Sequence, residues 1–250
     1  METLSRWIRQ SQSVLRWEGD AYGQALVNAV TGHVGTSLHL SGYPTSRDLL
    51  GFYGLSFVEA AMMPTLETPR LLLRPSELAD AEQTQVLFPH WEIVRYLDKI
   101  VPWPYPPDGA YTWYRDVALP AMDRGEEWHW TLRLRSSPAR MIGIISLKNK
   151  ENDNRGFWLG LPWQGQGFMT EACEAVTDYW FDVLKFPVLR APKAVLNTAS
   201  RRISERCGMR VVATGEHEYV SGRFPQEIWE ISAEEWHALR EHRESKGSAW

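Results

Sequence analysis

One segment constrains the fold of this chain more than any other. A strand-like run, GFWLGL from Gly156, is followed directly by a loop with two glycines one residue apart, PWQGQGFM, and then by the helical pattern TEACEAVTDYWFDVL from Thr170. Apolar residues of the helical part recur at a spacing of 3.6, at Ala172, Ala175, Val176, Tyr179, Trp180, Val183 and Leu184. The segment predicts a strand, a tight glycine loop and a helix that packs on the core.

Two known phosphate-binding patterns can be compared with the glycine loop. A P-loop requires GxxxxGK[ST], and here Gln166 and Gly167 stand where lysine and a hydroxyl are needed. A dinucleotide fingerprint requires a third glycine where this chain has Thr170. Both patterns share a physical basis that this loop retains, because glycine lets backbone N–H groups approach an anion and a helix start adds its positive dipole end. The loop is therefore either a pyrophosphate cradle or a plain tight turn.

The rest of the chain predicts a mixed domain. Strands are expected in RLLLRP, EWHWTLRLR, RMIGIISLKN, PVLRAPKAVL and FPQEIWEIS, and helices after Ser76 as N-cap, after VPWPYPPDG, and in NTASRRISERCGM up to Gly208. This order predicts an α/β (α+β) fold with a mixed sheet. Residues 1–62 are rich in Gly, Ser and Thr without a core pattern, so we expect a disordered or loosely packed N-terminal extension there and the domain over 63–245.

Charge and cysteine content exclude several classes of partner. The net charge of -4 offers no basic face for nucleic acid, and no apolar run is long enough to cross a membrane. Cys173 and Cys207 lack the spacing of a metal site and are expected to be small buried residues, so we expect no metal and a cytoplasmic protein.

Six segments, taken in order, resemble one known family. They are TPRLLLRP, PWPYPPDGAYTWY, IGIISL, GFWLGLPWQGQGFMTEA, NTASRRISERCGM and EIWEISAEEW, and together they resemble the GNAT acyltransferases, in particular the RimJ/RimL-like branch, over residues 65–240. The resemblance implies the GNAT fold, a mixed twisted sheet flanked by helices, whose fourth and fifth strands splay apart around acetyl-CoA. GFWLGL would be the fourth strand and APKAVL the fifth.

The resemblance also implies a cofactor site. Backbone amides of the glycine loop would hold the diphosphate of acetyl-CoA, and an N–H group of the splayed strand would bind the acyl oxygen. The expected acetyl-CoA-binding residues are Trp158, Leu159, Gly160, Gln164, Gly165, Gln166, Gly167, Phe168, Met169 and Asn197. Ser200, with Asn197 beside it, is expected to protonate the leaving thiolate. Asn and Ser are also common at helix starts, so helix capping is the alternative for both.

The acceptor side and the general base are less defined. In PWPYP, prolines are expected to expose Trp103 and Tyr105 to the acceptor substrate. The RimJ/RimL-like branch tends to carry an acidic residue shortly before the aromatic of the fourth strand, where this chain has Arg155, so no general base is assigned. Glu171, in the first turn of the helix, is expected to serve the helix dipole or a cap.

Strand alternation in EWHWTLRLR places Trp128 and Trp130 on one face and His129 on the other, and we expect Glu126 and Glu127 to be solvated. The function that follows is an N-acetyltransferase, monomeric or homodimeric, that moves an acetyl group from acetyl-CoA to the primary amine of a small molecule or of a protein N-terminus. The alternative is a GNAT-fold module that binds an acyl-CoA or a partner without turnover.

Overall fold

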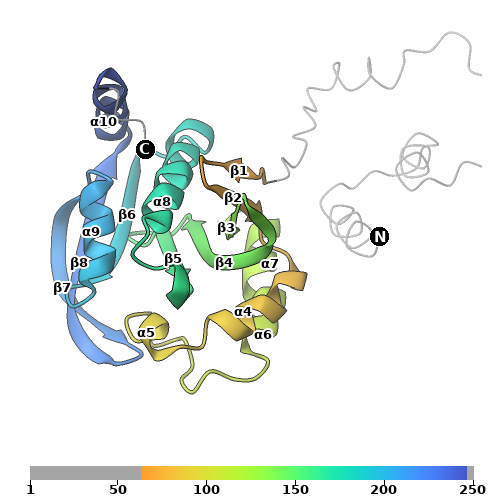
Figure 1. Cartoon of the computed structure of the whole chain (residues 1–250). Coiled ribbons are helices and arrows are strands. Elements are labelled where there is room, and N and C mark those ends of the chain that lie inside the picture. The colour runs from red at the N-terminus through yellow and green to blue at the C-terminus, as the bar shows by residue number, and fades with distance from the viewer. Residues whose placement is uncertain (1–62, 247–250) are drawn as a thin grey trace, which may run out of the picture. The chain divides into compact units, whose positions relative to one another are not determined.

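The structure is a computed structural model that describes residues 63–246 (Figure 1), so the expected extension at 1–62 lies outside the described residues. The strands are β1 (Leu66–Glu67), β2 (Leu71–Pro75), β3 (Glu127–Leu134), β4 (Ser137–Lys148), β5 (Arg155–Leu159), β6 (Val188–Ala194), β7 (Arg210–Tyr219) and β8 (Gly222–Ser232). The helices are η1 (Leu78–Asp80), α4 (Ala81–Leu87), α5 (Trp91–Val94), α6 (Gly109–Trp113), η2 (Tyr114–Ala118), α7 (Leu119–Asp123), η3 (Leu161–Trp163), α8 (Phe168–Asp178), η4 (Tyr179–Val183), α9 (Thr198–Arg206) and α10 (Ala233–Ser245).

The strands of the described part form two sheets. One has the order β1-β2-β3-β4-β5 and the other the order β6-β8-β7, and every paired neighbour is antiparallel. The break falls between β5 and β6, which are the strands predicted to splay. Pro192, which has no N–H to donate, lies on β6 at the edge of its sheet, where proline is tolerated.

β5 and β6 are joined at one end only. The backbone N–H of Asn154 donates to the carbonyl of Arg190, and the N–H of Arg190 donates to the side-chain oxygen of Asn154, both at 2.7 Å. After this point β5 pairs with β4 and β6 pairs with β8. The two strands therefore part from Asn154 onward, and the glycine loop follows the free end of β5.

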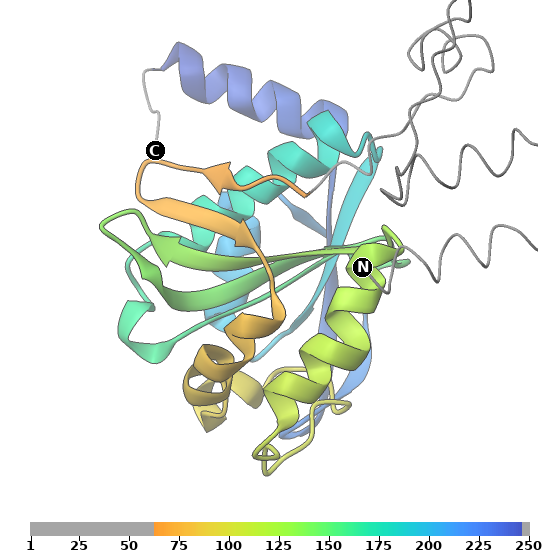
Figure 2. The same cartoon turned by 90° about the vertical axis from the view of Figure 1, so that its right-hand side faces the viewer.

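Helices cover both faces of the five-stranded sheet (Figures 1 and 2). On one face α8 packs over the main core, which the two sheets build with Leu71, Leu73, Trp130, Leu132, Ile145, Leu147, Leu189, Trp229 and Ile231. On the other face lie α4, α6 and η2, around Met141, Ile144, Ala110 and Tyr114. Cys173 and Cys207 are buried free thiols in the main core, as predicted.

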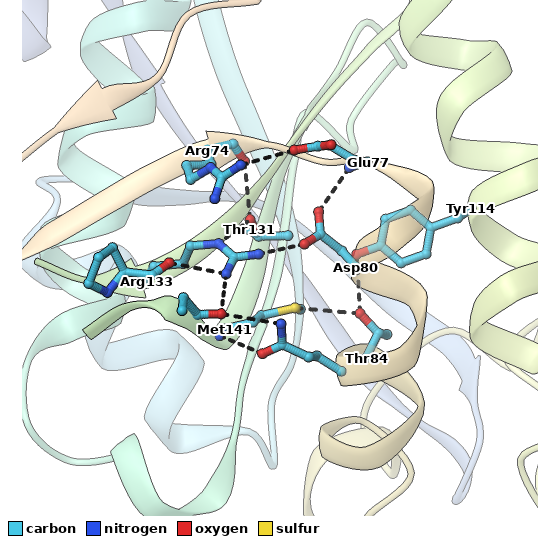
Figure 3. A network of polar contacts seen from close by, with 11 residues as sticks. Arg74, Glu77, Asp80, Thr84, Tyr114, Thr131, Arg133 and Met141 are labelled. Atoms are coloured by element: carbon cyan, nitrogen blue, oxygen red, sulfur yellow. Dashed lines mark hydrogen bonds and ion pairs between the residues drawn. The ribbon is translucent and has the colours of Figure 1, made fainter.

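A buried polar network fixes η1 and α4 to the second face (Figure 3). Asp80 and Arg133 form an ion pair at 2.5 Å with both side chains buried, and Arg133 also donates to the carbonyl of Ala139 at 2.7 Å. The helix start is a capping box between Glu77 and Asp80, so the prediction of Ser76 as N-cap was wrong. Ser76 is buried, and its N–H donates to the carbonyl of His129, which continues the β2–β3 pairing beyond Pro75.

One helical position also differs from its prediction. Val183 was expected on the core face but is 58% exposed, whereas Phe181 is buried. The helix that begins as α8 ends in the π turn η4, and the wider turn rotates the last residues relative to a 3.6 repeat.

Candidate active site

The glycine loop leaves consecutive backbone N–H groups free. Gly165 and Gly167 have φ angles of 74° and 81°, in the left-handed region that glycine enters without steric cost. Within 63–246, no group accepts a hydrogen bond from the amides of residues 165–169. Gly167 immediately precedes α8, so these amides lie at the positive end of that helix. The expected cradle is one residue shorter at its start, because the N–H of Gln164 donates to the carbonyl of Leu161 at 3.3 Å.

Arg70 and Glu171 fix the shape of this loop. Glu171 is 5% exposed and accepts hydrogen bonds from the Thr68 hydroxyl at 2.5 Å, the Arg70 N–H at 2.8 Å and the Arg70 Nε at 2.6 Å. The same guanidinium donates to the carbonyl of Gln166 at 3.0 Å and stacks 4.5 Å above the Phe168 ring. Glu171 therefore acts as an internal anchor in the first turn of α8, where the sequence predicted a residue that serves the helix dipole or a cap.

The backbone N–H groups of β5 alternate in direction: some pair with β4, and others point to the gap between β5 and β6. The N–H of Gly160 donates to the carbonyl of Ile142 at 2.8 Å. In antiparallel pairing every second residue faces the same neighbour, so the N–H of Trp158 also faces β4. The amides of Phe157 and Leu159 point away from β4, toward the gap before β6. Of the residues expected to bind the acyl oxygen, Leu159 has the suitable N–H direction.

The start of α9 lies at the end of β6. Asn197 is the N-cap, and its Oδ1 accepts the N–H of Ser200 at 3.2 Å. The Ser200 side chain is buried at 7% exposure, and within the described residues its Oγ makes no hydrogen bond. Helix capping thus accounts for Asn197 but not for the Ser200 hydroxyl.

Two buried cations lie where β5 and β6 part. Arg155 is 1% exposed and donates to Thr177 Oγ1 at 2.9 Å and to Met209 Sδ at 3.2 Å. Lys193 is 7% exposed, with Nζ 4.6 Å from the centre of the Phe157 ring. Burial, and next the charge of Arg155, lower the pKa of Lys193 to about 8. Neither cation is paired with a carboxylate of residues 63–246. Sequence reasoning did not identify Lys193, because its burial results from the separation of β5 and β6 into two sheets, which no local pattern shows.

The predicted acceptor residues differ in exposure. Trp103 is 42% exposed and packs at 5.6 Å against Trp91, as expected for a surface aromatic. Tyr105 is half-buried instead of exposed, because its ring packs edge-on against Phe88 at 5.0 Å and lies directly over Gly109. Burial raises the pKa of Tyr105 to about 12. Trp103 is therefore the better placed of the two to contact a ligand.

A cavity of about 710 Å³ borders the glycine loop on the side of α8 and α10. Its lining combines cations and carboxylates, among them Arg70, Gly167, Glu174, Arg206, Arg240 and Arg243. Residues 63–246 contain no group of three His, Cys, Asp or Glu side chains positioned to hold a metal ion. No helix in this range is long and apolar enough to cross a membrane.

The family follows from the sequence match. Residues 70–210 match the family model described as "Acetyltransferase (GNAT) domain". The chain belongs to the GNAT acetyltransferase family. The family and the fold class expected from the six segments are thereby confirmed.

Curated relatives include two proteins of Bacillus subtilis. The putative ribosomal N-acetyltransferase YdaF is 35% identical over 72 residues, which cover 27% of this chain and 39% of YdaF, so the chain matches well under half of that relative. The probable N-acetyltransferase YjcK is 28% identical over 158 residues, which cover 57% of this chain and 82% of YjcK.

Solved structures share the fold at low identity. A ribosomal-protein-S5-alanine acetyltransferase from Vibrio fischeri has a TM-score of 0.60 and 14% identity, covering 69% of this chain and 98% of that chain. A spermidine N-acetyltransferase from Vibrio cholerae, in complex with CoA and spermine, has a TM-score of 0.57 and 19% identity, covering 68% and 99%.

Proposed function

We propose that this protein is an N-acetyltransferase that transfers an acetyl group from acetyl-CoA to a primary amine of a small molecule or of a protein N-terminus. The observation that carries the proposal is the row of free amides at residues 165–169, at the start of α8 and directly after a strand that leaves its neighbour. A diphosphate fits such a row, because it accepts several N–H donors at the positive end of a helix.

Acetyl-CoA would supply an activated acetyl thioester. The chain would hold its diphosphate on the amides of Gly165 to Met169, and an N–H on the free edge of β5, that of Phe157 or of Leu159, would donate to the acyl oxygen. Ser200, whose hydroxyl is not used by the helix cap, would give a proton to the departing sulfur. Trp103 would contact the acceptor.

An amine attacks only in its neutral form. An α-amino group has a pKa of about 8 and a lysine side chain one of about 10.4, so an N-terminus is deprotonated far more easily at neutral pH. The names of the similar proteins, which include ribosomal-protein and spermidine acetyltransferases, support an amine acceptor of either kind. With its two buried free cysteines, we expect the enzyme to work in the cytoplasm.

The test is the release of free CoA thiol from acetyl-CoA in the presence of a panel of polyamines, peptides with free N-termini and aminoglycosides. We expect acceptor-dependent release with at least one class. Tight binding of acetyl-CoA without release for any acceptor would favour the alternative, a module that binds acyl-CoA without turnover.

A further inference from the structure

Three side chains on the face of β3 and β4 opposite α8 form a continuous hydrogen-bonded relay. His129 on β3 is paired in register with Ser146 on β4. Its Nδ1 lies 2.6 Å from Ser146 Oγ, and its Nε2 lies 2.7 Å from Glu127 Oε2. His129 is 1% exposed, whereas the Glu127 side chain is 25% exposed. The relay thus runs from a buried hydroxyl, through a buried imidazole, to a carboxylate that reaches solvent.

These three residues differ from their neighbours on the same face. Arg133 and Thr131 continue the row along β3, but both belong to the network that docks η1 and α4 (Figure 3). Within the described residues, the side chains of Glu127, His129 and Ser146 hydrogen-bond only with one another. The ring of Trp113 covers His129 edge-on at 5.2 Å. The packing of η1 and α4 on the sheet therefore does not explain the hydrogen bonds among Glu127, His129 and Ser146.

The donor and acceptor roles follow from the partners. Burial alone would raise the pKa of Glu127, but the hydrogen bond and charge of His129, with Lys148 and Lys150 nearby, hold that pKa below its ordinary value. An ionised carboxylate can only accept, so Nε2 donates its proton to Glu127. In the tautomer with its proton on Nε2, Nδ1 accepts the Ser146 hydroxyl proton, which leaves the Oγ lone pairs free. From the helical side Trp113 contributes only a neutral ring.

Ser146 lies beside the place where β5 and β6 part. Its partner in register on β5 is Gly156, two residues after Asn154. Gly156 carries no side chain, and a Cβ placed there would meet only the end of Lys148, at 3.8 Å from Nζ. Ser146 itself is 7% exposed, so on this sheet face, opposite α8, an amine would reach its hydroxyl over Gly156 and past the end of the Lys148 side chain.

We propose that Ser146, His129 and Glu127 form the proton relay that deprotonates the acceptor amine. The inference rests on the proposed acetyl transfer. As the amine nitrogen bonds to the acyl carbon and the carbon–sulfur bond breaks, one amine proton passes to Ser146 Oγ and the serine proton passes to His129 Nδ1. The thiolate takes a separate proton from Ser200 or water. Ser146 is the residue that contacts substrate, and His129 and Glu127 act through it.

Four variants test the relay in the acetyl-transfer assay with an active acceptor. Ser146→Ala should lower kcat about 10²-fold, and Ser146→Thr, which restores a hydroxyl, should recover most of it. His129→Asn should lower kcat about as far as Ser146→Ala does, with the KM for acetyl-CoA unchanged. Glu127→Gln should lower kcat less, also at an unchanged KM for acetyl-CoA, because the Nε2 proton keeps a hydrogen-bond acceptor but loses the negative charge beside it. Acetyl-CoA affinity and the urea midpoint, measured on each variant, separate the relay from a structural role.

Glu126→Gln is the matched control, because Glu126 is the adjacent carboxylate, is exposed and pairs with Arg124. It should leave both kcat and the KM for acetyl-CoA unchanged. An active wild-type enzyme whose kcat survives His129→Asn would overturn the relay and leave the proposed function intact. An acetyl group found on Ser146 by mass spectrometry would replace the relay by a double displacement. A wild-type protein that binds acetyl-CoA but acetylates no amine would overturn both proposals.

Discussion

Lys193 makes the stability of this protein depend on pH in a way that one substitution removes. Its side chain is buried without a carboxylate partner among the described residues, and burial, then the charge of Arg155, lower its pKa from 10.5 to about 8. The unfolded chain therefore binds more protons than the folded protein between pH 8 and 10.5, so the free energy of unfolding rises with pH in that window. Below pH 8 the full cost of the buried ammonium is present.

The size of the effect follows from the two pKa values. The interval from about 8 to 10.5, at about 1.36 kcal/mol per pH unit, corresponds to about 3 kcal/mol. Lys193→Met keeps most of the side-chain length and removes the charge. At pH 7 the variant should be more stable than the wild type by up to about 3 kcal/mol, and this advantage should disappear as the pH approaches 10.5.

Urea unfolding at intervals from pH 7 to 10.5, for the wild type and the variant in parallel, measures the difference directly. Tyrosines and other groups titrate in both proteins and cancel in that difference. Lys150→Met is the control for the loss of a lysine, because the Lys150 side chain is 67% exposed and pairs with Asp153 at the surface. This variant should be no more stable than the wild type at pH 7. A constant difference between wild type and Lys193→Met across the range would refute the reasoning.

Two further predictions concern the donor site. Ser200→Ala should lower kcat by about 10² at an unchanged urea midpoint. Asn197→Ala should cost about 1 kcal/mol of stability, because Asn197 holds the helix cap. A shifted midpoint with wild-type kcat for Ser200→Ala would remove Ser200 from the mechanism. Gly165→Ala and Gly167→Ala should each lower the stability by about 1–2 kcal/mol because of their positive φ angles, and should weaken acetyl-CoA binding in calorimetry. Gly215→Ala is the control, because Gly215 has open space around it, and it should change neither stability nor binding. Unchanged affinity in both loop variants would argue against the cradle.

Local patterns predicted the elements whose signals are local. The alternation in β3, the apolar run of β4 and the glycine stop after α9 are each contained in about ten residues, and all three elements formed as expected. β7 was not predicted, because almost all of its residues are exposed and it shows no two-residue alternation of apolar side chains. The glycine loop was found for the same local reason, since both positive φ angles fall on glycines two residues apart.

The chemistry of the site depends on pairs that are distant in sequence. Glu171 meets Arg70 across 101 residues, and His129 meets Ser146 through the register of two strands. The spacing of apolar residues along the sequence does not indicate such contacts. The expectation that Glu127 is solvated held only in part, because one of its oxygens binds the buried imidazole. Strand alternation could have placed His129 and Glu127 on one face, but identifying Ser146 as their partner requires the β3–β4 register, which the sequence does not show.

One face of the five-stranded sheet carries groups that bind anions and the other carries groups that accept protons, and this suits the proposed reaction. On the side of α8 lie the free loop amides and the buried cations Arg155 and Lys193, which favour an anionic donor such as a diphosphate ester. On the other side lie Ser146 and His129, with the carboxylate of Glu127 behind them, which favour an amine that must lose a proton. β5 lies at the edge between the two, where it parts from β6. Donor and acceptor would then approach the same strand edge from opposite faces, so that neither has to leave its binding groups for the acyl carbon and the amine nitrogen to meet.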